Sequence, residues 1–208
     1  MLAYVFWHWK RPEALASDYE ARQRGFHAAL AQAPAPGFVS SFTAAVSGVP
    51  WAAASDAYED WYLVRDFTAL GVLNEAAVSD SRTRPHAAAA ALVAGGTAGL
   101  YRLKSGVALE APTHAHWFGK PEGMSYAELF AALEPSVARG GVALWMRQMV
   151  LGPAREFCLH AMLPLSLPDA LGARRGGTEM VQSTVSLRAV WPHASPENSV
   201  IARTVPSS

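Results

Sequence analysis

Apolar residues along the first hundred positions follow two periods, one typical of strands and one typical of helices. Short segments rich in aromatic and β-branched residues predict strands at residues 3–9, 38–47, 58–65 and 100–104. Apolar positions three or four apart predict a helix that begins at Pro12 and helices over residues 67–78 and 85–94. This order of strand, helix, strand, strand, helix and strand is that of a ferredoxin-like βαββαβ unit.

The opening of the chain returns once, much later. Residues 3–13 and 113–122 share the same order of features. Each begins with aromatic and histidine residues, continues with a basic residue and Pro-Glu, and is followed by a helical pattern. The second copy predicts strands at 114–118, 142–151, 156–163 and 180–190, and helices after the capping box Ser125-x-x-Glu128 and at 168–175. Nothing in it corresponds to residues 81–94. We therefore divide the chain into a first unit (1–106), a linker (107–112), a second unit (113–192) and an irregular tail (193–208).

Two such units predict an α+β fold. The antiparallel sheets of two tandem ferredoxin-like βαββαβ units are expected to pack together as an α/β barrel within one chain. Each unit alone would leave a broad apolar sheet face in water, which a domain of about 100 residues does not easily tolerate. Because the duplication supplies the partner, the barrel needs no second chain, and further self-association through other surfaces stays open.

The charge balance removes several classes of function. The 208 residues include 17 Lys plus Arg and 17 Asp plus Glu, so the formal net charge is zero, and neither nucleic acid nor a membrane surface is an expected partner. No apolar run reaches the ~20 residues of a membrane span, and residues 1–10 lack the features of a signal peptide, so a cytoplasmic protein is expected. The single cysteine, Cys158, lies in an apolar segment and is expected to be buried.

The repeated start, together with residues 58–66 running into the helix at 67–78, resembles the dimeric α/β-barrel superfamily. Its members include antibiotic-biosynthesis monooxygenases, EthD-like and NIPSNAP-like proteins and, with two fused units, chlorite dismutase-like proteins. The resemblance covers residues 2–191 at the level of topology. It implies a cavity between a sheet and its helices that holds a small apolar molecule, sometimes haem.

Differences between this sequence and the superfamily pattern affect whether a haem cofactor is expected. The first strand has no asparagine, which the haem-degrading monooxygenases carry there. In chlorite dismutase-like proteins a histidine of the second unit binds haem, and His160 and His193 stand near that place. His114 and His116 share one face of a strand, but no third metal ligand stands nearby. We therefore expect no cofactor and no metal, with haem as the alternative.

The first unit carries the candidate catalytic histidines. His8 shares a strand face with Tyr4 and Phe6, which would line a pocket, and it is interpreted as a base or as a hydrogen-bonded core residue. His86 stands in the first turn of a predicted helix, where the positive end of the dipole favours a neutral ring suited to a base. An exposed surface histidine is the alternative at that position.

The strand at 58–65 mixes aromatic and polar side chains, which is typical of a small-molecule pocket. We predict Tyr62 as a third candidate catalytic group and Trp61 as part of the apolar lining. Glu59 and Asp60 alternate along this strand, so they face opposite sides and form no carboxylate pair. The site is therefore expected between the sheet of the first unit and the two helices that follow this strand.

Three functions fit these features. The first is a cofactor-independent oxygenase or isomerase that acts on an apolar or aromatic small molecule. The second is a non-catalytic binding protein for a hydrophobic small molecule or haem. The third is a structural or stress-related protein whose cavity is filled by its own side chains. The partner expected from the first two is a small apolar molecule.

Overall fold

The computed structural model of the protein describes residues 1–149, 152, 154–168 and 183–192. The strands are β1 (Leu2–Lys10), β2 (Phe38–Ser47), β3 (Asp56–Val64), β4 (Val93–Gly106), β5 (His114–Phe118), β6 (Val142–Arg147), β7 (Phe157–Ala161), β8 (Ser183–Ser186) and β9 (Arg188–Trp191). The helices are α1 (Ala16–Gln32), α2 (Phe67–Ala77), the short 3₁₀ helix η1 (Asp80–Arg82), α3 (Thr83–Ala90) and α4 (Tyr126–Ala138).

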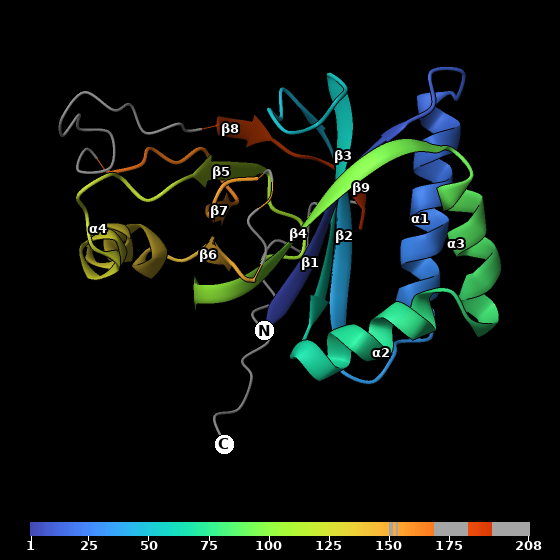
Figure 1. Ribbon diagram of the computed structural model, residues 1–208, viewed down its shortest axis with the longest axis horizontal. Helices are drawn as coiled ribbons and strands as arrows, with labels where there is room; N and C mark the ends of the chain where they lie inside the picture. The colour runs from blue at the N-terminus through green and yellow to red at the C-terminus, as the bar shows by residue number, and fades with distance from the viewer. Residues whose placement is uncertain (150–151, 153, 169–182, 193–208) are drawn as a thin grey trace.

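All the strands described belong to one antiparallel sheet with the order β8-β5-β7-β6-β4-β1-β3-β2-β9. Within it, β4-β1-β3-β2 and β8-β5-β7-β6 repeat the same ferredoxin-like order. Helices α1, α2 and α3 cover the outer face of the first set of strands, and α4 lies beside the second set (Figure 1). The predicted fold class, two tandem ferredoxin-like units forming a barrel within one chain, is therefore confirmed.

Two long segments join the halves of the barrel. The first part of β4 pairs with β1, and its last part, from Tyr101 to Gly106, pairs with β6. In the second half, β8 pairs with β5, and β9 pairs with β2. Only Leu187 separates β8 from β9. The two ends of the sheet are therefore one bent segment, and the barrel nearly closes on itself.

Some element boundaries differ from the sequence prediction. Helix α1 begins at Ala16 rather than at Pro12, because residues 11–14 form a turn in which the backbone N–H of Ala14 donates to the carbonyl of Arg11. Strand β4 begins at Val93, although its first residues were expected to end a helix. Pairing with β1 extends it, which a local sequence pattern does not reveal. The helix predicted at 168–175 and the tail at 193–208 lie outside the described residues.

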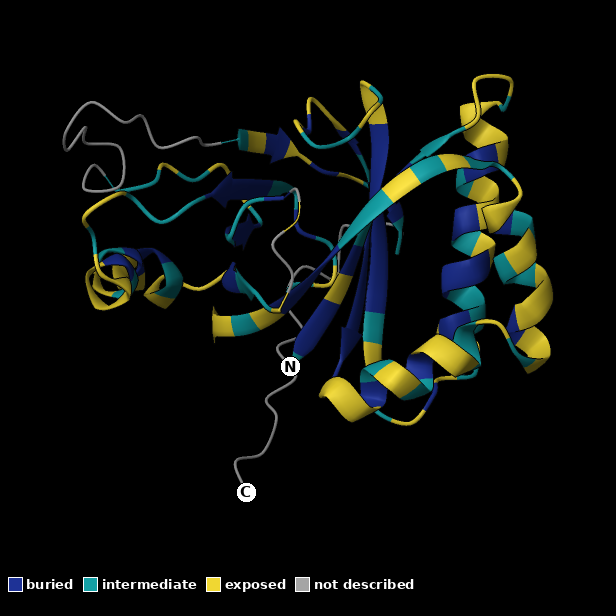
Figure 2. Cartoon of the chain, viewed as in Figure 1, coloured by how far each residue is buried: buried dark blue, intermediate teal, exposed yellow. Residues whose placement is uncertain are grey.

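The two faces of the central strands have different surroundings. Alternate residues of β1 and β3, such as Val5, Trp7 and Trp61, point into the barrel, where they are buried against Trp117 and Trp145. The other residues of both strands face the helices. Figure 2 shows most residues of the central strands in the dark blue of buried positions. Contact with the barrel core on one face and with the helices on the other is consistent with aromatic residues on both faces of β1.

The carboxylate of Glu59 is buried in the barrel interior. The indole N–H of Trp7 donates to its Oε2 at 2.6 Å, and the indole N–H of Trp61 donates to its Oε1 at 2.5 Å. Hydrogen bonds of this kind offset the cost of removing a charge from water. No helix in the described residues combines the length and the apolar composition that crossing a membrane requires.

Close packing between β1 and β4 depends on Gly96. A Cβ atom at this position would meet the ring of Phe6 and would lie 2.8 Å from the backbone oxygen of Trp7, which cannot move aside. We predict that Gly96→Ala lowers the free energy of unfolding by about 1–3 kcal/mol, as overpacked cores do. Urea denaturation measures the change.

The matched control is Gly25→Ala in α1, where a Cβ atom would meet nothing within 4 Å. That change should raise stability by about 0.5–1 kcal/mol, because alanine is the better helix former. Equal effects of the two substitutions would show that the β1–β4 contact is not tight.

Candidate functional site

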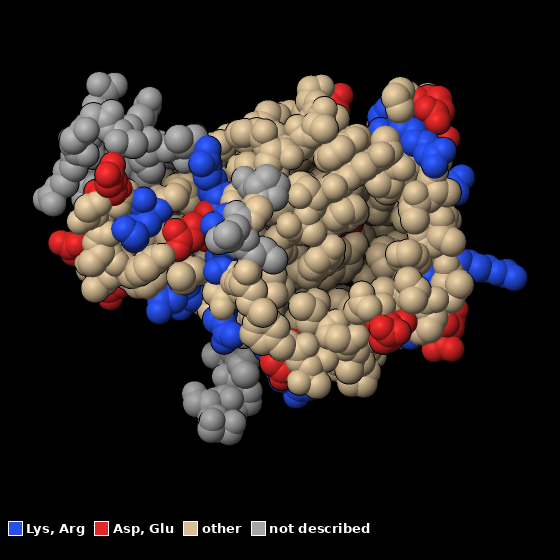
Figure 3. Space-filling view, viewed as in Figure 1, with Lys and Arg blue, Asp and Glu red and all other residues tan. Residues whose placement is uncertain are grey.

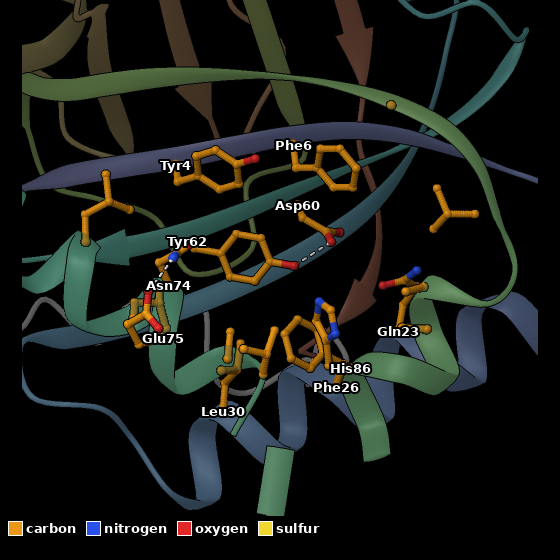
Figure 4. Close-up of a pocket in the computed structure, with 18 of the residues that line it drawn as sticks. Tyr4, Phe6, Gln23, Phe26, Leu30, Asp60, Tyr62, Asn74, Glu75 and His86 are labelled. Atoms are coloured by element: carbon orange, nitrogen blue, oxygen red, sulfur yellow. Dashed lines mark hydrogen bonds between the residues drawn. The ribbon is translucent and has the colours of Figure 1, made fainter. Parts of the chain in front are cut away.

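A cavity of about 1030 Å³ lies between the outer face of the sheet and helices α1, α2 and α3. Its walls are mostly aromatic and aliphatic, from residues that include Tyr4, Phe6, Phe26, Leu30, Phe67, Leu70 and Leu73. Its polar lining consists of Gln23, Asp60, Tyr62, Asn74, Glu75 and His86. Figure 3 shows a hollow on this face with mostly tan walls, and Figure 4 shows the side chains from β1, β3 and the helices turned toward one another. Apolar walls with a few polar groups are typical of a small-molecule site.

Asp60 is the charged group at the floor of this cavity, and it is only 1% exposed. Its Oδ1 lies 3.0 Å from Nε2 of His8, and its Oδ2 lies 3.5 Å from Nε2 of His27. The hydroxyl of Tyr62 donates a hydrogen bond to Oδ2 at 2.8 Å. The carboxylate thus stands between two imidazoles and a phenol. Within the described residues, Oδ1 has no hydrogen bond of good geometry.

The two histidines change the acidity of this carboxyl. Burial alone would raise the pKa of Asp60, but His8 and His27 outweigh it and lower that pKa well below its ordinary value of 3.8. Burial, and then the charge of Asp60, raises the pKa of Tyr62. At neutral pH the site therefore contains an ionised carboxylate next to a neutral phenol.

Each imidazole is held from its other side. Nδ1 of His8 is hydrogen-bonded to the hydroxyl of Tyr19. Nδ1 of His27 is hydrogen-bonded to Oγ of Ser41 at 2.7 Å. Tyr62 stacks on His27 with ring centres 5.2 Å apart and the planes 6° from parallel. These contacts fix both rings against the carboxylate.

The roof of the cavity is fixed by Arg82, a buried residue of η1. Its Nε donates to the carbonyl of Ala76 at 2.6 Å, and its Nη1 donates to the carbonyl of Ala33 at 2.5 Å. These carbonyls lie at the C-terminal ends of α2 and α1, where the negative end of the helix dipole attracts a cation. Arg82 therefore holds the segment leading into α3 against the other two helices.

The structure brings most of the predicted site residues to this place. Tyr4, Phe6 and Tyr62 line the cavity, and His86 lies half-buried at its wall with its ring 5.2 Å from that of Phe26. His8 is completely buried behind Phe6, which stacks on its ring. Whether any of them takes part in chemistry stays a prediction.

Trp61 lies elsewhere. The alternation along β3 turns its ring into the barrel, next to Glu59, while Asp60 and Tyr62 face the cavity. The prediction that Glu59 and Asp60 face opposite sides is confirmed. The same alternation of side chains along a strand, applied to Trp61 and Tyr62, also predicts that these two residues face opposite sides of the sheet.

Sequence reasoning missed Asp60, Gln23 and His27. Tyr19, Gln23 and His27 are spaced by four residues on α1, so they form one polar stripe on its buried face. A histidine and a glutamine at core positions of an amphipathic helix are uncommon, and this spacing was the available signal. Nothing local indicated that the stripe would meet Asp60.

His160, one of the two histidines considered for haem, does not line this cavity. His160 is completely buried inside the barrel, with its ring 4.3 Å from that of Trp61, and its Nε2 is 3.9 Å from Oε1 of Glu59. Aromatic rings pack around it, so it does not fit the role of a haem ligand. His193 lies outside the described residues. Cys158 is buried, as expected. The described part of the chain holds no cluster of three or more metal-ligating side chains.

No protein-family model and no curated protein matches the sequence. A candidate monooxygenase from Lactobacillus acidophilus NCFM superposes over 91% of this chain and 94% of its own, with a TM-score of 0.55 and 10% sequence identity. A candidate chlorite dismutase superposes over 90% of this chain and 94% of its own, with a TM-score of 0.51 and 11% identity.

The chain has the dimeric α/β-barrel fold. In this fold, as the strand order shows, two ferredoxin-like units share one barrel, and here one chain supplies both. An anthrone oxidase-like protein superposes over 91% of the chain with 12% identity, at a TM-score of 0.42. At such identities the likeness concerns the barrel fold and leaves the chemistry to be argued from the cavity.

Asp60 should make stability depend on acid. Its pKa is depressed in the folded protein, so it stabilises the fold above its ordinary value of 3.8. Below that pH the unfolded chain takes up a proton that the folded chain does not, and this stabilisation is lost as the pH falls further. We predict that Asp60→Asn costs about 3–5 kcal/mol near pH 7, as expected for one partner of a buried charged cluster.

Urea denaturation at several pH values tests this prediction, and the gap between parent and variant should narrow below pH 4. Asp56→Asn is the control, because Asp56 is an exposed carboxylate on the same strand. It should change stability by less than about 0.5 kcal/mol at any pH. A gap that widens in acid would contradict the depressed pKa.

Proposed function

We propose that the protein binds a flat, mostly apolar small molecule in the cavity beneath α1, α2 and α3, and that Asp60 accepts a proton from it. The observation that carries this proposal is the placement of a buried carboxylate, flanked by His8 and His27, at the floor of an otherwise apolar cavity. Proton removal of this kind is the first step of a cofactor-independent oxygenase or of an isomerase acting on an aromatic substrate.

The chemistry follows from the neighbours of the carboxylate. A carboxylate of depressed pKa is a weak base, but it accepts a hydrogen bond well and can hand a proton to an imidazole. Asp60 lines the cavity, its buried Oδ1 has no hydrogen bond of good geometry within the described residues, and Nε2 of His8 stands 3.0 Å from Oδ1 to take the proton. Tyr62 holds the other carboxylate oxygen in place. The site therefore positions a ligand O–H or acidic C–H against a prearranged base.

The walls restrict the shape of the ligand. Phe6, Phe26 and Tyr62 present aromatic surfaces, which favour flat rings in offset or edge-to-face contact. The described side chains leave the cavity open, which favours a ligand-binding role over that of a structural protein with a filled cavity. A protein that binds such a molecule without reaction would use the same walls but would not need the proton-accepting pair.

The lining also restricts the charge of the ligand. Two carboxylates, Asp60 and Glu75, contribute to it, and none of its residues in the described structure is Lys or Arg. A ligand carboxylate or phosphate would meet like charge and no cation. The ligand is therefore neutral or cationic.

Ligand charge can be tested with two probes of equal shape, 2-naphthol and 2-naphthoate. We expect 2-naphthol to bind about tenfold or more tightly than 2-naphthoate, because like charges at a site cost affinity. Fluorescence titration measures both constants. Asp60→Asn should reduce this preference more than Glu75→Gln, since Glu75 is exposed and screened by water. Tighter binding of the carboxylate would contradict the proposal.

The catalytic roles require the natural ligand, which native mass spectrometry of freshly purified protein can reveal. We expect His8→Ala to lower turnover of that ligand by about 10²-fold or more, the usual contribution of a proton-transfer group. His86→Ala, at the wall, should weaken binding with a smaller effect on turnover. His114→Ala in the second half is the control and should change neither.

If the His8 and His86 variants, and the double variant, bind and turn over the ligand like the parent while a His160 substitution abolishes binding, the site lies in the second half. If the ligand binds but is recovered unchanged after long incubation, the protein is a binding protein. A visible spectrum of the same preparation reports bound haem directly.

A further inference from the structure

A second, smaller cavity of about 420 Å³ lies at the end of α1, beside β2 and β9. Ser40 and Ser41 of β2, Glu110 and Trp191 contribute to its walls. None of the described residues lines both cavities. The two spaces are nevertheless connected by side chains, because Ser41 is the partner of His27.

We infer that His27 and Ser41 form a proton relay that connects Asp60, at the floor of the large cavity, with the small cavity. The inference rests on the proposed function, since the relay serves the proton that Asp60 accepts. It assigns a role to two residues that do not line the large cavity, and it gives the small cavity the role of a proton exit.

The relay consists of consecutive polar contacts. Oδ2 of Asp60 lies 3.5 Å from Nε2 of His27, and Nδ1 of His27 lies 2.7 Å from Oγ of Ser41. Ser41 is 9% exposed and lines the small cavity, whereas His27 is completely buried. The first distance is long for a hydrogen bond, but such contacts commonly shorten when a ligand is bound. Within the described residues Nε2 of His27 has no hydrogen-bond partner of good geometry, so the contact with Asp60 is the step that must shorten for transfer.

The other branch from Asp60 returns to the ligand. His8 is hydrogen-bonded to Tyr19, whose hydroxyl interacts with the side chain of Gln23. Gln23 lines the large cavity. A ligand in that cavity would therefore cover the end of this branch. The His27 branch is the one that reaches a different space while the ligand is bound.

The transfer balances without any further reactant. The proton on Asp60 passes to Nε2 of His27, the proton on Nδ1 of His27 passes to Oγ of Ser41, and the hydroxyl proton of Ser41 passes to water in the small cavity. After the transfer Asp60 is again ionised, the ring of His27 has gained a proton on Nε2 and given one up from Nδ1, and Ser41 keeps one proton. Reprotonation of the site follows the same route in reverse.

The relay can be tested without the natural ligand, by NMR of ¹⁵N-labelled protein transferred to D₂O. The exchange rate of the His27 ring proton is measured in the parent, in Ser41→Ala and in Ser40→Ala. Ser40 lines the same small cavity, but it is not the partner of His27. We expect Ser41→Ala to slow exchange about tenfold or more, because only local opening of the structure would remain. Ser40→Ala should exchange like the parent.

Ser41→Thr keeps the hydroxyl and suits a strand, so it should exchange like the parent. This variant also covers the case in which Ser41→Ala fails to fold, since a folded Ser41→Thr with slowed exchange would overturn the relay. Unchanged or faster exchange in a folded Ser41→Ala would overturn it as well. Binding of 2-naphthol is measured on the same samples. If the parent protein does not bind 2-naphthol, the large cavity is refuted as a ligand site. The exchange rates test the relay alone.

Discussion

The burial of the Asp60 carboxylate on β3 is the constraint on which the first half of the structure depends. A single ionised group at the centre of a sheet is costly unless charged or hydrogen-bonding partners surround it. Its partners come from three elements: His8 from β1, His27 from α1 and Tyr62 from β3 itself. The position of α1 over the sheet is therefore set by a polar contact as well as by apolar packing.

The neighbouring carboxylate, Glu59, is stabilised by different partners on the other face of the same strand. It is neutral indole donors, from Trp7 and Trp61, that hold it inside the barrel. Burial lowers the pKa of the nearby His160 even though Glu59 acts in the opposite sense, so that ring is neutral. Two adjacent acidic residues on one strand thus lie in two layers of the fold. Glu59 is bound by indole N–H groups inside the barrel, and Asp60 lines the cavity under the helices.

Much of the fold could be predicted because its signals are local. The repeated opening strand and the capping box of Ser125 and Glu128 both appear in the structure where the sequence indicates them. The start of β4 could not be predicted in this way. Gly95 and Gly96 suggest a loop, but they form a strand through pairing with β1, with the rings of Trp9 and Phe6 in the space that a Cβ atom would take.

The candidate site was predictable only in part, for the same reason. Strand alternation places Tyr4, Phe6 and Tyr62 on one face, and these residues line the cavity. Alternation does not tell which helix covers that face, so the contact between His27 and Asp60 could not be derived from either segment alone. A sequence therefore predicts which functional groups of one strand share a face. It does not predict which groups of a helix and a strand come into contact when the helix packs on the sheet.

The way the barrel closes has a consequence for synthesis of the chain. The outer edge of β2 is paired by β9, which stands near the end of the described chain. While the ribosome is still making the residues in between, this edge has no partner and its backbone groups are open to other strands. Closure of the barrel must wait for the last strand, which makes the fold slow by its topology. The nascent chain is thus exposed to misassociation from the synthesis of β2 until that of β9.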